Sequence, residues 1–281
     1  MDIKLGKQPP RIDKRTIKLS SILRKELLPE LPVSYDIDGN LGVEDNFIFG
    51  NDTYGDCVKA ARAHQTLRFE KYEQGTQPVI TDDEVVKEYF NETGGFDIGL
   101  VLLNSLNDWR NDGWMVGDRI YTIYAYASVD WKNHDEVKHC IHLLGGVNFG
   151  MQVYSKDIEQ FKNGEIWSLT PDSGKLEGGH GVYLYAYDDE GITCMTWGKR
   201  QKMTWEFWDA RVDEAYGIVD NRDDWVGNSP VDVALLDSYL DEITAGNEST
   251  CQFSQAIVKF LNGLWWASGR ETRFKAVCGK K

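Results

Sequence analysis

The sequence predicts an α+β fold, with a group of helices followed by an antiparallel sheet. From Cys57 to about residue 113, apolar side chains recur every three or four positions, which is the spacing of one helix face. From about residue 119 they fall into short runs, rich in β-branched and aromatic residues and bounded by glycines, which is typical of strands. The chain has 281 residues, 41% of them hydrophobic, enough for one large domain with an appendage.

The first of these helices follows a glycine-rich turn at residues 50–55 and is expected to run from Cys57 to about Tyr72. One face carries residues at helical spacing, namely Ala60, Ala63, His64 and Leu67. Asp56 lies at the N-cap position, directly before the cysteine. Free N–H groups at a helix start favour thiolate over thiol, as a nucleophilic cysteine requires. A buried structural cysteine is the alternative.

Two further helices complete the helical part. Thr81 and Glu84 form a capping box that opens the first, which ends at Gly94-Gly95. Asp97 is expected to cap the second, which ends at Gly113. The core-facing stripe of this second helix consists of Leu100, Leu103, Leu106 and Trp109.

The sheet part is predicted to begin with a strand at 119–127, a helix at 134–144 and a strand at 147–153. Three histidines lie on that helix, namely His134, His139 and His142. We interpret them as surface polarity and not as a metal site, because no carboxylate or cysteine is spaced on the same face to complete a tetrahedral set.

A β-hairpin is expected next, with runs at 180–187 and 192–198 around an acidic turn that includes Gly191. His180 opens the first run directly after two glycines. A lone histidine there is usually structural, but together with a helix-start cysteine it fits a Cys/His nucleophile pair. Residues 199–202 are interpreted as a basic turn, Thr204 as the cap of a short aromatic helix, and 214–219 as a closing strand.

These motifs resemble those of the papain-like cysteine peptidases. In that family a glutamine lies six residues before the nucleophile and a glycine two residues before it, and here Asn51 and Gly55 hold those positions relative to Cys57. The family has Asn-Ser-Trp-Gly after the histidine hairpin, where this chain has Met195-Thr196-Trp197-Gly198. The resemblance covers roughly residues 45–220. It is closest to papain-fold proteins of unassigned role encoded by tailed phages and bacteria.

The resemblance implies a papain-like two-lobed fold, a helical lobe against an antiparallel β-lobe, with the site between them. Cys57 would attack an amide carbonyl, and His180 would take and return the proton. Asn51 and the Cys57 backbone N–H would hold the oxyanion. No metal and no cofactor is needed.

Other roles follow from the same resemblance. Met195 stands at the position of the asparagine that orients the histidine, and methionine cannot accept the histidine N–H. Thr196 is the nearest polar substitute for that role. Gly55, Gly179 and Trp197 would border the substrate.

The expected organisation is an extended N-terminal arm at 1–45, a papain-like domain at 46–226 and a C-terminal helical hairpin at 227–281. Prolines favour a wrapping arm, while a propeptide-like or docking segment remains open. The hairpin carries two apolar stripes, one of Val233, Leu235, Leu236, Tyr239, Leu240 and Ile243 and one of Phe253, Ile257, Phe260, Leu261, Leu264, Trp265 and Trp266. These must pack on the domain, on a protein partner or on a second copy.

Composition limits the remaining function classes. A net charge of −14 and a pI near 4.8 argue against binding nucleic acid or an anionic membrane. Without a signal peptide or an apolar span, and with five widely spaced cysteines, we expect a cytoplasmic protein, or a virion protein if a phage encodes it.

Two functions therefore stay open. One is a thiol hydrolase that cleaves a peptide, isopeptide or cell-wall amide bond. The other is a catalytically weak or inactive structural component of a phage particle or other assembly, docking through its C-terminal helices.

Overall fold

A computed structural model describes residues 3–220 and 230–244, and the chain divides into two compact units, residues 1–230 and 231–281. Of the second unit, residues 233–244 form a helix. The rest of the expected hairpin, including Trp265 and Trp266, lies outside the described residues. Within the described ranges, no helix is long and apolar enough to cross a membrane.

The first unit begins with the N-terminal arm, which wraps the domain in short elements and buries Leu19 and Ile22 in the core. These elements are α1 (Leu19–Ile22), a 3-10 turn (Lys25–Leu27), β1 (Tyr35–Asp36) and α2 (Asp38–Leu41). The helical lobe follows, with α3 (Cys57–Gln74), α4 (Asp82–Thr93), α5 (Leu102–Asn111) and a hairpin of β2 (Trp114–Val116) and β3 (Arg119–Tyr121).

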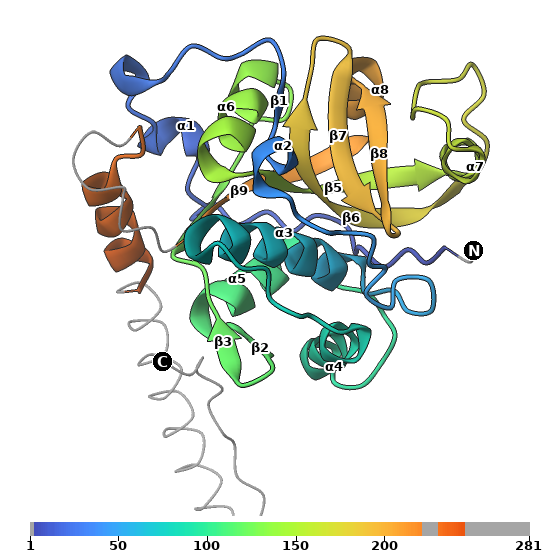
Figure 1. Ribbon diagram of the computed structural model, residues 1–281, viewed down its shortest axis with the longest axis horizontal. Coiled ribbons are helices and arrows are strands. Elements are labelled where there is room, and N and C mark those ends of the chain that lie inside the picture. Colours follow the sequence, from blue (N-terminus) through green and yellow to red (C-terminus); the bar gives the residue numbers. More distant parts are fainter. Residues whose placement is uncertain (1–2, 221–229, 245–281) are drawn as a thin grey trace, which may run out of the picture. The chain divides into compact units, whose positions relative to one another are not determined.

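The β-lobe is a seven-stranded sheet whose main path runs in the order β4-β9-β5-β6-β7-β8, with every pair antiparallel and with β1 added beside β6. Its strands are β4 (Ala125–Ser128), β5 (Val147–Tyr154), β6 (Leu176–Tyr187), β7 (Gly191–Thr196), β8 (Lys199–Thr204) and β9 (Val212–Val219). Its helices are α6 (His134–Leu144), α7 (Ser155–Asn163) and α8 (Trp205–Arg211). Figure 1 shows α3 lying between this sheet and the rest of the helical lobe.

The central helix α3 is buried on almost every side, including its charged residues. Burying a charge is costly unless it is paired, and each of these side chains has a partner. Lys59 lies 2.5 Å from Glu92, Arg62 donates to the Ser105 hydroxyl, His64 lies 2.9 Å from Asp45, and Arg68 pairs with Asp38 and Asp45. This network ties α3 to α4, to α5 and to the segment at 38–45.

Local signals in the sequence predicted several elements correctly. The capping box of Thr81 and Glu84 is present, with the Thr81 hydroxyl accepting from the Glu84 N–H and the Glu84 carboxylate accepting from the Thr81 N–H. The helix at 134–144, the β6–β7 hairpin and the Thr204 cap of α8 are also confirmed.

Three local predictions are wrong. Asp97 does not cap a helix, because α5 begins at Leu102 and the Asp97 carboxylate is bound elsewhere. The single strand at 119–127 is two strands, β3 and β4, which pair in different sheets. Residues 199–202 are not a turn but lie in β8, because Trp197 and Gly198 already make the tight turn after β7. Helix α7 was not predicted.

Candidate active site

The start of α3 is held by the turn that precedes it. The Gly55 N–H donates to Asp97 Oδ1 at 2.9 Å, and the Tyr89 hydroxyl donates to the same oxygen at 2.7 Å. The Tyr89 oxygen in turn accepts from the Gly99 N–H at 2.8 Å. Asp97 therefore fixes the turn that carries Cys57, a positioning role that the sequence did not indicate, because its partners lie far along the chain.

Strand β6 brings His180 to the same place. The N–H of Gly181, the residue after His180, donates to Cys57 Sγ at 3.3 Å. A Cβ atom at Gly181 would lie 2.9 Å from the Val58 side chain and 3.3 Å from its Cα, so a glycine lets β6 approach the helix this closely. The structure thus brings together the two residues that the sequence singled out from distant segments.

The imidazole of His180 is fixed by two neighbours from the β7–β8 turn. Its Nε2 lies 2.6 Å from Thr196 Oγ1, and its ring stacks on Trp197 with centroids 4.1 Å apart and planes 10° apart. Its Nδ1 is buried and has no hydrogen-bond partner among the described residues. If Nε2 donates to the threonine oxygen, Nδ1 holds the free lone pair that a general base needs.

The stacking geometry depends on an unusual turn. Trp197 has φ of +45° and Gly198 has φ of +71°, so both lie in the left-handed region of a two-residue hairpin turn. A tryptophan is strained in this conformation. Phe161 packs edge-on against its ring at 4.8 Å, and this contact helps to hold the side chain over His180.

Asn51, expected at the oxyanion position, is buried in the turn before α3. Its Nδ2 donates to the Tyr54 carbonyl at 3.1 Å. The Asn51 side chain also lowers the pKa of the neighbouring Asp56 carboxyl against the effect of burial. The oxyanion role of Asn51 stays a prediction.

The N-terminal arm lies directly across this site. The Lys4 N–H donates to the Asn51 carbonyl at 3.2 Å, and Trp197 Nε1 donates to the Lys4 carbonyl at 3.4 Å. The Gly6 N–H acts on Cys57 as well, since it lowers the pKa of the thiol against the effect of burial. Two residues expected to border a substrate, Gly55 and Gly179, border the arm instead.

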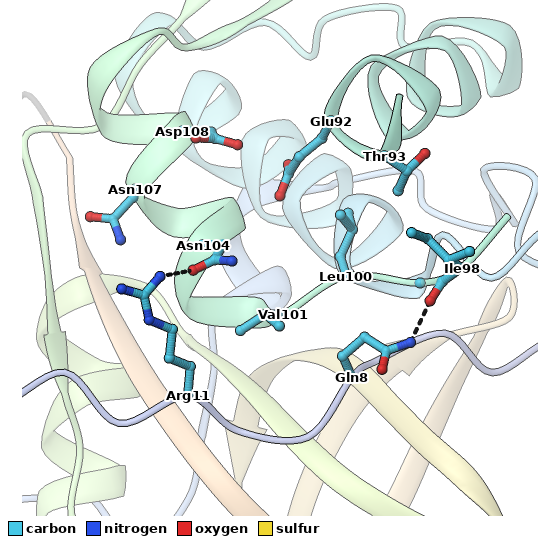
Figure 2. Close-up of a pocket in the computed structure, with 11 residues that line it drawn as sticks. Gln8, Arg11, Glu92, Thr93, Ile98, Leu100, Val101, Asn104, Asn107 and Asp108 are labelled. Atoms are coloured by element: carbon cyan, nitrogen blue, oxygen red, sulfur yellow. Dashed lines mark hydrogen bonds between the residues drawn. The ribbon is translucent and has the colours of Figure 1, made fainter. Parts of the chain in front are cut away.

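The arm is also paired with both lobes through its backbone. The Gly6 carbonyl accepts from the Leu100 N–H at 2.8 Å, and the Gln8 N–H donates to the Leu100 carbonyl at 2.8 Å. On the β-lobe side, the Lys7 N–H donates to the Gly179 carbonyl at 3.0 Å. Figure 2 shows the arm continuing past α5, where Arg11 donates to Asn104 Oδ1 at 2.7 Å. A hollow of about 740 Å³ remains between the arm and the helical lobe there.

Burial under the arm sets the protonation of both central groups. Cys57 is 1% exposed, and burial raises its pKa to about 11 against the opposing effect of the Gly181 and Gly6 N–H groups. Burial lowers the pKa of His180 to about 3. The lowered cysteine pKa expected from the helix start is therefore wrong for this arm-bound structure, since desolvation outweighs the helix dipole. At neutral pH both groups are uncharged.

Asp56 also departs from expectation. It lies at the N-cap position of α3, but its side chain makes no capping bond, and it is fully buried. This burial raises its pKa to about 8 from 3.8. Between these two values the folded state holds a proton that the unfolded chain releases, so this group makes stability fall as pH rises.

We expect Asp56→Asn to flatten that fall. The difference in unfolding free energy between variant and wild type should change with pH in favour of the variant, by up to about 1.4 kcal/mol per pH unit between pH 4 and 8. Urea unfolding at several pH values measures it. Asp83→Asn, at a more exposed position near the start of α4, is the control. Parallel pH dependences for Asp56→Asn and wild type would contradict the assigned protonation.

No protein-family model matches this chain, and no curated protein is similar to it in sequence. Solved structures are similar in fold. Xylellain, a cysteine protease from Xylella fastidiosa, has a TM-score of 0.62 and 18% identity, over 79% of this chain and 97% of that one. The cysteine protease CMS1MS2 of Carica candamarcensis, solved with E-64, has a TM-score of 0.53 and 15% identity over 68% and 100%.

A third similar structure is procathepsin B S9 from Trypanosoma congolense, with a TM-score of 0.57 and 10% identity over 77% of this chain and 86% of that one. At these identities the likeness establishes the fold. The mixed helical and antiparallel architecture is therefore the papain-like fold expected from the sequence. In the described part of the chain, no group of three or more His, Cys, Asp or Glu side chains is placed to hold a metal ion.

Proposed function

We propose that the protein is a papain-like cysteine hydrolase that cleaves amide bonds, with Cys57 as nucleophile and His180 as general base. The observation that carries the proposal is the placement of His180. Thr196 engages its Nε2, and Trp197 covers one face of its ring. The next residue, Gly181, donates its N–H to the Cys57 sulfur, and His180 Nδ1 has no partner among the described residues. A purely structural histidine gains nothing from a buried nitrogen without a partner.

The reaction follows from this arrangement. His180 Nδ1 takes the thiol proton, and the sulfur bonds to the carbonyl carbon of the substrate. The Cys57 N–H and the Asn51 side-chain amide stabilise the oxyanion. His180 then gives its proton to the amine that leaves, which yields a thioester. Water, deprotonated by His180, releases the acid and restores the thiol.

In the structure described here the enzyme is latent. The arm covers the sulfur, and both catalytic groups are uncharged. The Gly6 carbonyl accepts from the Leu100 N–H at 2.8 Å, so the arm is held as a plug and not as a substrate. The arm must leave the cleft before a peptide, an isopeptide or a cell-wall amide can enter.

A peptide carrying a terminal electrophile tests the proposal. In full-length protein whose arm is weakened by Gly6→Ala, we expect one covalent adduct per chain, located on Cys57 by peptide mass mapping. Cys57→Ala should abolish the adduct, whereas Cys194→Ala, at a second buried cysteine, should keep it. Absence of the Cys57 adduct, in a protein shown by circular dichroism to be folded, would overturn the proposal.

The alternative is a catalytically weak or inactive papain-fold structural component of a phage particle or other assembly that docks through residues 227–281. It is favoured by one observation, the burial of both Cys57 and His180 in uncharged form. Native mass spectrometry of the full chain and of a 1–226 truncation tests it. An oligomer that becomes a folded monomer on truncation supports docking, and a monomeric full chain contradicts it.

A further inference from the structure

We propose that the cleft beside Cys57 contains a slot that selects a lysine side chain of the substrate, and that Lys7 of the arm occupies this slot as an internal stand-in. The inference rests on the proposed function and names the substrate class of the same site. The main observation behind this proposal is that the chain buries one lysine side chain close to the proposed nucleophile.

The lysine is buried on two carboxylates. The Lys7 side chain is 1% exposed, and its Nζ lies 2.7 Å from Asp213 Oδ1 and 3.0 Å from Glu214 Oε1. Both acids come from β9, and the Glu214 carboxylate also accepts from the Tyr216 hydroxyl at 3.1 Å. Two carboxylates at a cleft floor repel each other unless a cation lies between them. When the arm leaves, the slot requires another ammonium group.

Glycines give the slot its shape. A Cβ atom at Gly150 on β5 would lie 2.0 Å from Lys7 Cε and 2.7 Å from its Cδ, so the aliphatic stem occupies the space that a side chain would fill. A Cβ atom at Gly179 on β6 would lie 2.3 Å from the Lys7 carbonyl oxygen. The backbone at Gly150 lies directly against this stem, which leaves little room for the broader, planar guanidinium of arginine.

The slot is in register with the catalytic pair. Gly150 pairs with Gly181, the residue whose N–H binds the sulfur, and the adjacent Met151 pairs with His180. Along the arm, Gly6 lies against Gly55 in the turn before Cys57, and Lys7 is the next residue. A peptide in the cleft would therefore place the side chain in the slot within one residue of the group at the nucleophile.

The exchange of arm for substrate preserves the charge balance. A substrate lysine would restore both ion pairs that Lys7 makes, so the buried acids keep a cation in both states. A substrate with an uncharged or acidic side chain at this position would leave them unpaired. The net charge of −14 further favours the approach of basic peptides.

The test compares peptide electrophiles that differ in one side chain, on full-length Gly6→Ala protein. The probes carry lysine, norleucine or arginine at either of the two residues next to the electrophile. Norleucine has a similar aliphatic stem without the ammonium group. We expect the lysine probe to label Cys57 at least about 10-fold faster than the norleucine probe at one of these positions. Glu214→Gln and Asp213→Asn should each remove most of the difference.

Asp209→Asn is the control for net charge, since Asp209 is a surface acid on α8. It should keep the lysine preference. Equal labelling rates for the lysine and norleucine probes, or a lysine preference that survives both slot variants, would overturn the lysine slot. In either case, labelling of Cys57 would still support the hydrolase proposal. An arginine probe as fast as the lysine probe would overturn selection of lysine. If no probe labels Cys57, the proposed function fails with it.

Discussion

Gly6→Ala should make Cys57 react with iodoacetamide at pH 7 at least about 100-fold faster than in the wild-type protein. A Cβ atom at Gly6 would lie 1.7 Å from the Gly55 carbonyl oxygen, and neither backbone can yield as a flexible side chain would. The arm must therefore move away from the sulfur. With a pKa of about 11, only about one thiol in ten thousand is ionised at pH 7, and a return to an ordinary value near 8.5 raises this fraction several hundred-fold.

Peptide mass mapping over a time course measures this rate. Gly39→Ala is the matched control, because a Cβ atom there would meet nothing within 4 Å. Cys140 and Cys194 serve as internal references, since burial raises the pKa of both and neither lies at the cleft. Labelling of these two at the same rate would indicate unfolding. Equal labelling of Cys57 in Gly6→Ala and wild type would show that the arm does not guard the sulfur.

This result would also decide how far the sequence-based expectation holds. The helix start before Cys57 predicts a reactive thiolate, and that prediction is correct only if the arm is absent. The arm could not be placed from the sequence, because its prolines and basic residues indicate an extended segment and nothing about its partners. Lys7 pairs with Asp213 and Glu214, which lie about 200 residues later in the sequence, and no local pattern encodes these contacts.

The elements that were predicted correctly are encoded by short local motifs. The capping box at Thr81, the hairpin after His180 and the cap at Thr204 are each encoded within a few residues. The order of these elements, together with the spacing before Cys57, was enough to indicate the papain-like fold. Thr196 is the nearest polar substitute for the expected asparagine, and the structure places it against His180 Nε2.

The predictions that are wrong concern residues whose partners lie elsewhere in the sequence. Asp97 was assigned to a helix cap because it precedes a helical pattern, but it binds Gly55 and Tyr89. Residues 199–202 carry charges typical of a turn, yet they lie in β8, which pairs with β7, and Gln201 is buried there. In both cases tertiary contacts outweighed local composition.

In arm-displaced protein, His180→Ala should lower the rate of acylation by a peptide ester by about 1,000-fold or more, because Cys57 then loses its general base. Thr196→Val keeps the size of the side chain but removes the oxygen 2.6 Å from Nε2. The imidazole then loses its orientation and its preferred tautomer, so we expect about a 10- to 100-fold lower kcat with little change in KM.

Thr193→Val, on the same strand β7, is the matched control and should leave kcat within about 2-fold. Thermal unfolding of each variant separates loss of catalysis from loss of fold. A Thr196→Val protein as active as wild type would mean that Trp197 alone orients the ring, through the stack at 4.1 Å. A His180→Ala protein that still acylates at the wild-type rate would remove His180 from the mechanism and with it the Cys/His assignment. Since a hydroxyl orients an imidazole through one short bond, the Thr196 result measures how much of the catalytic power this fold retains without an orienting amide.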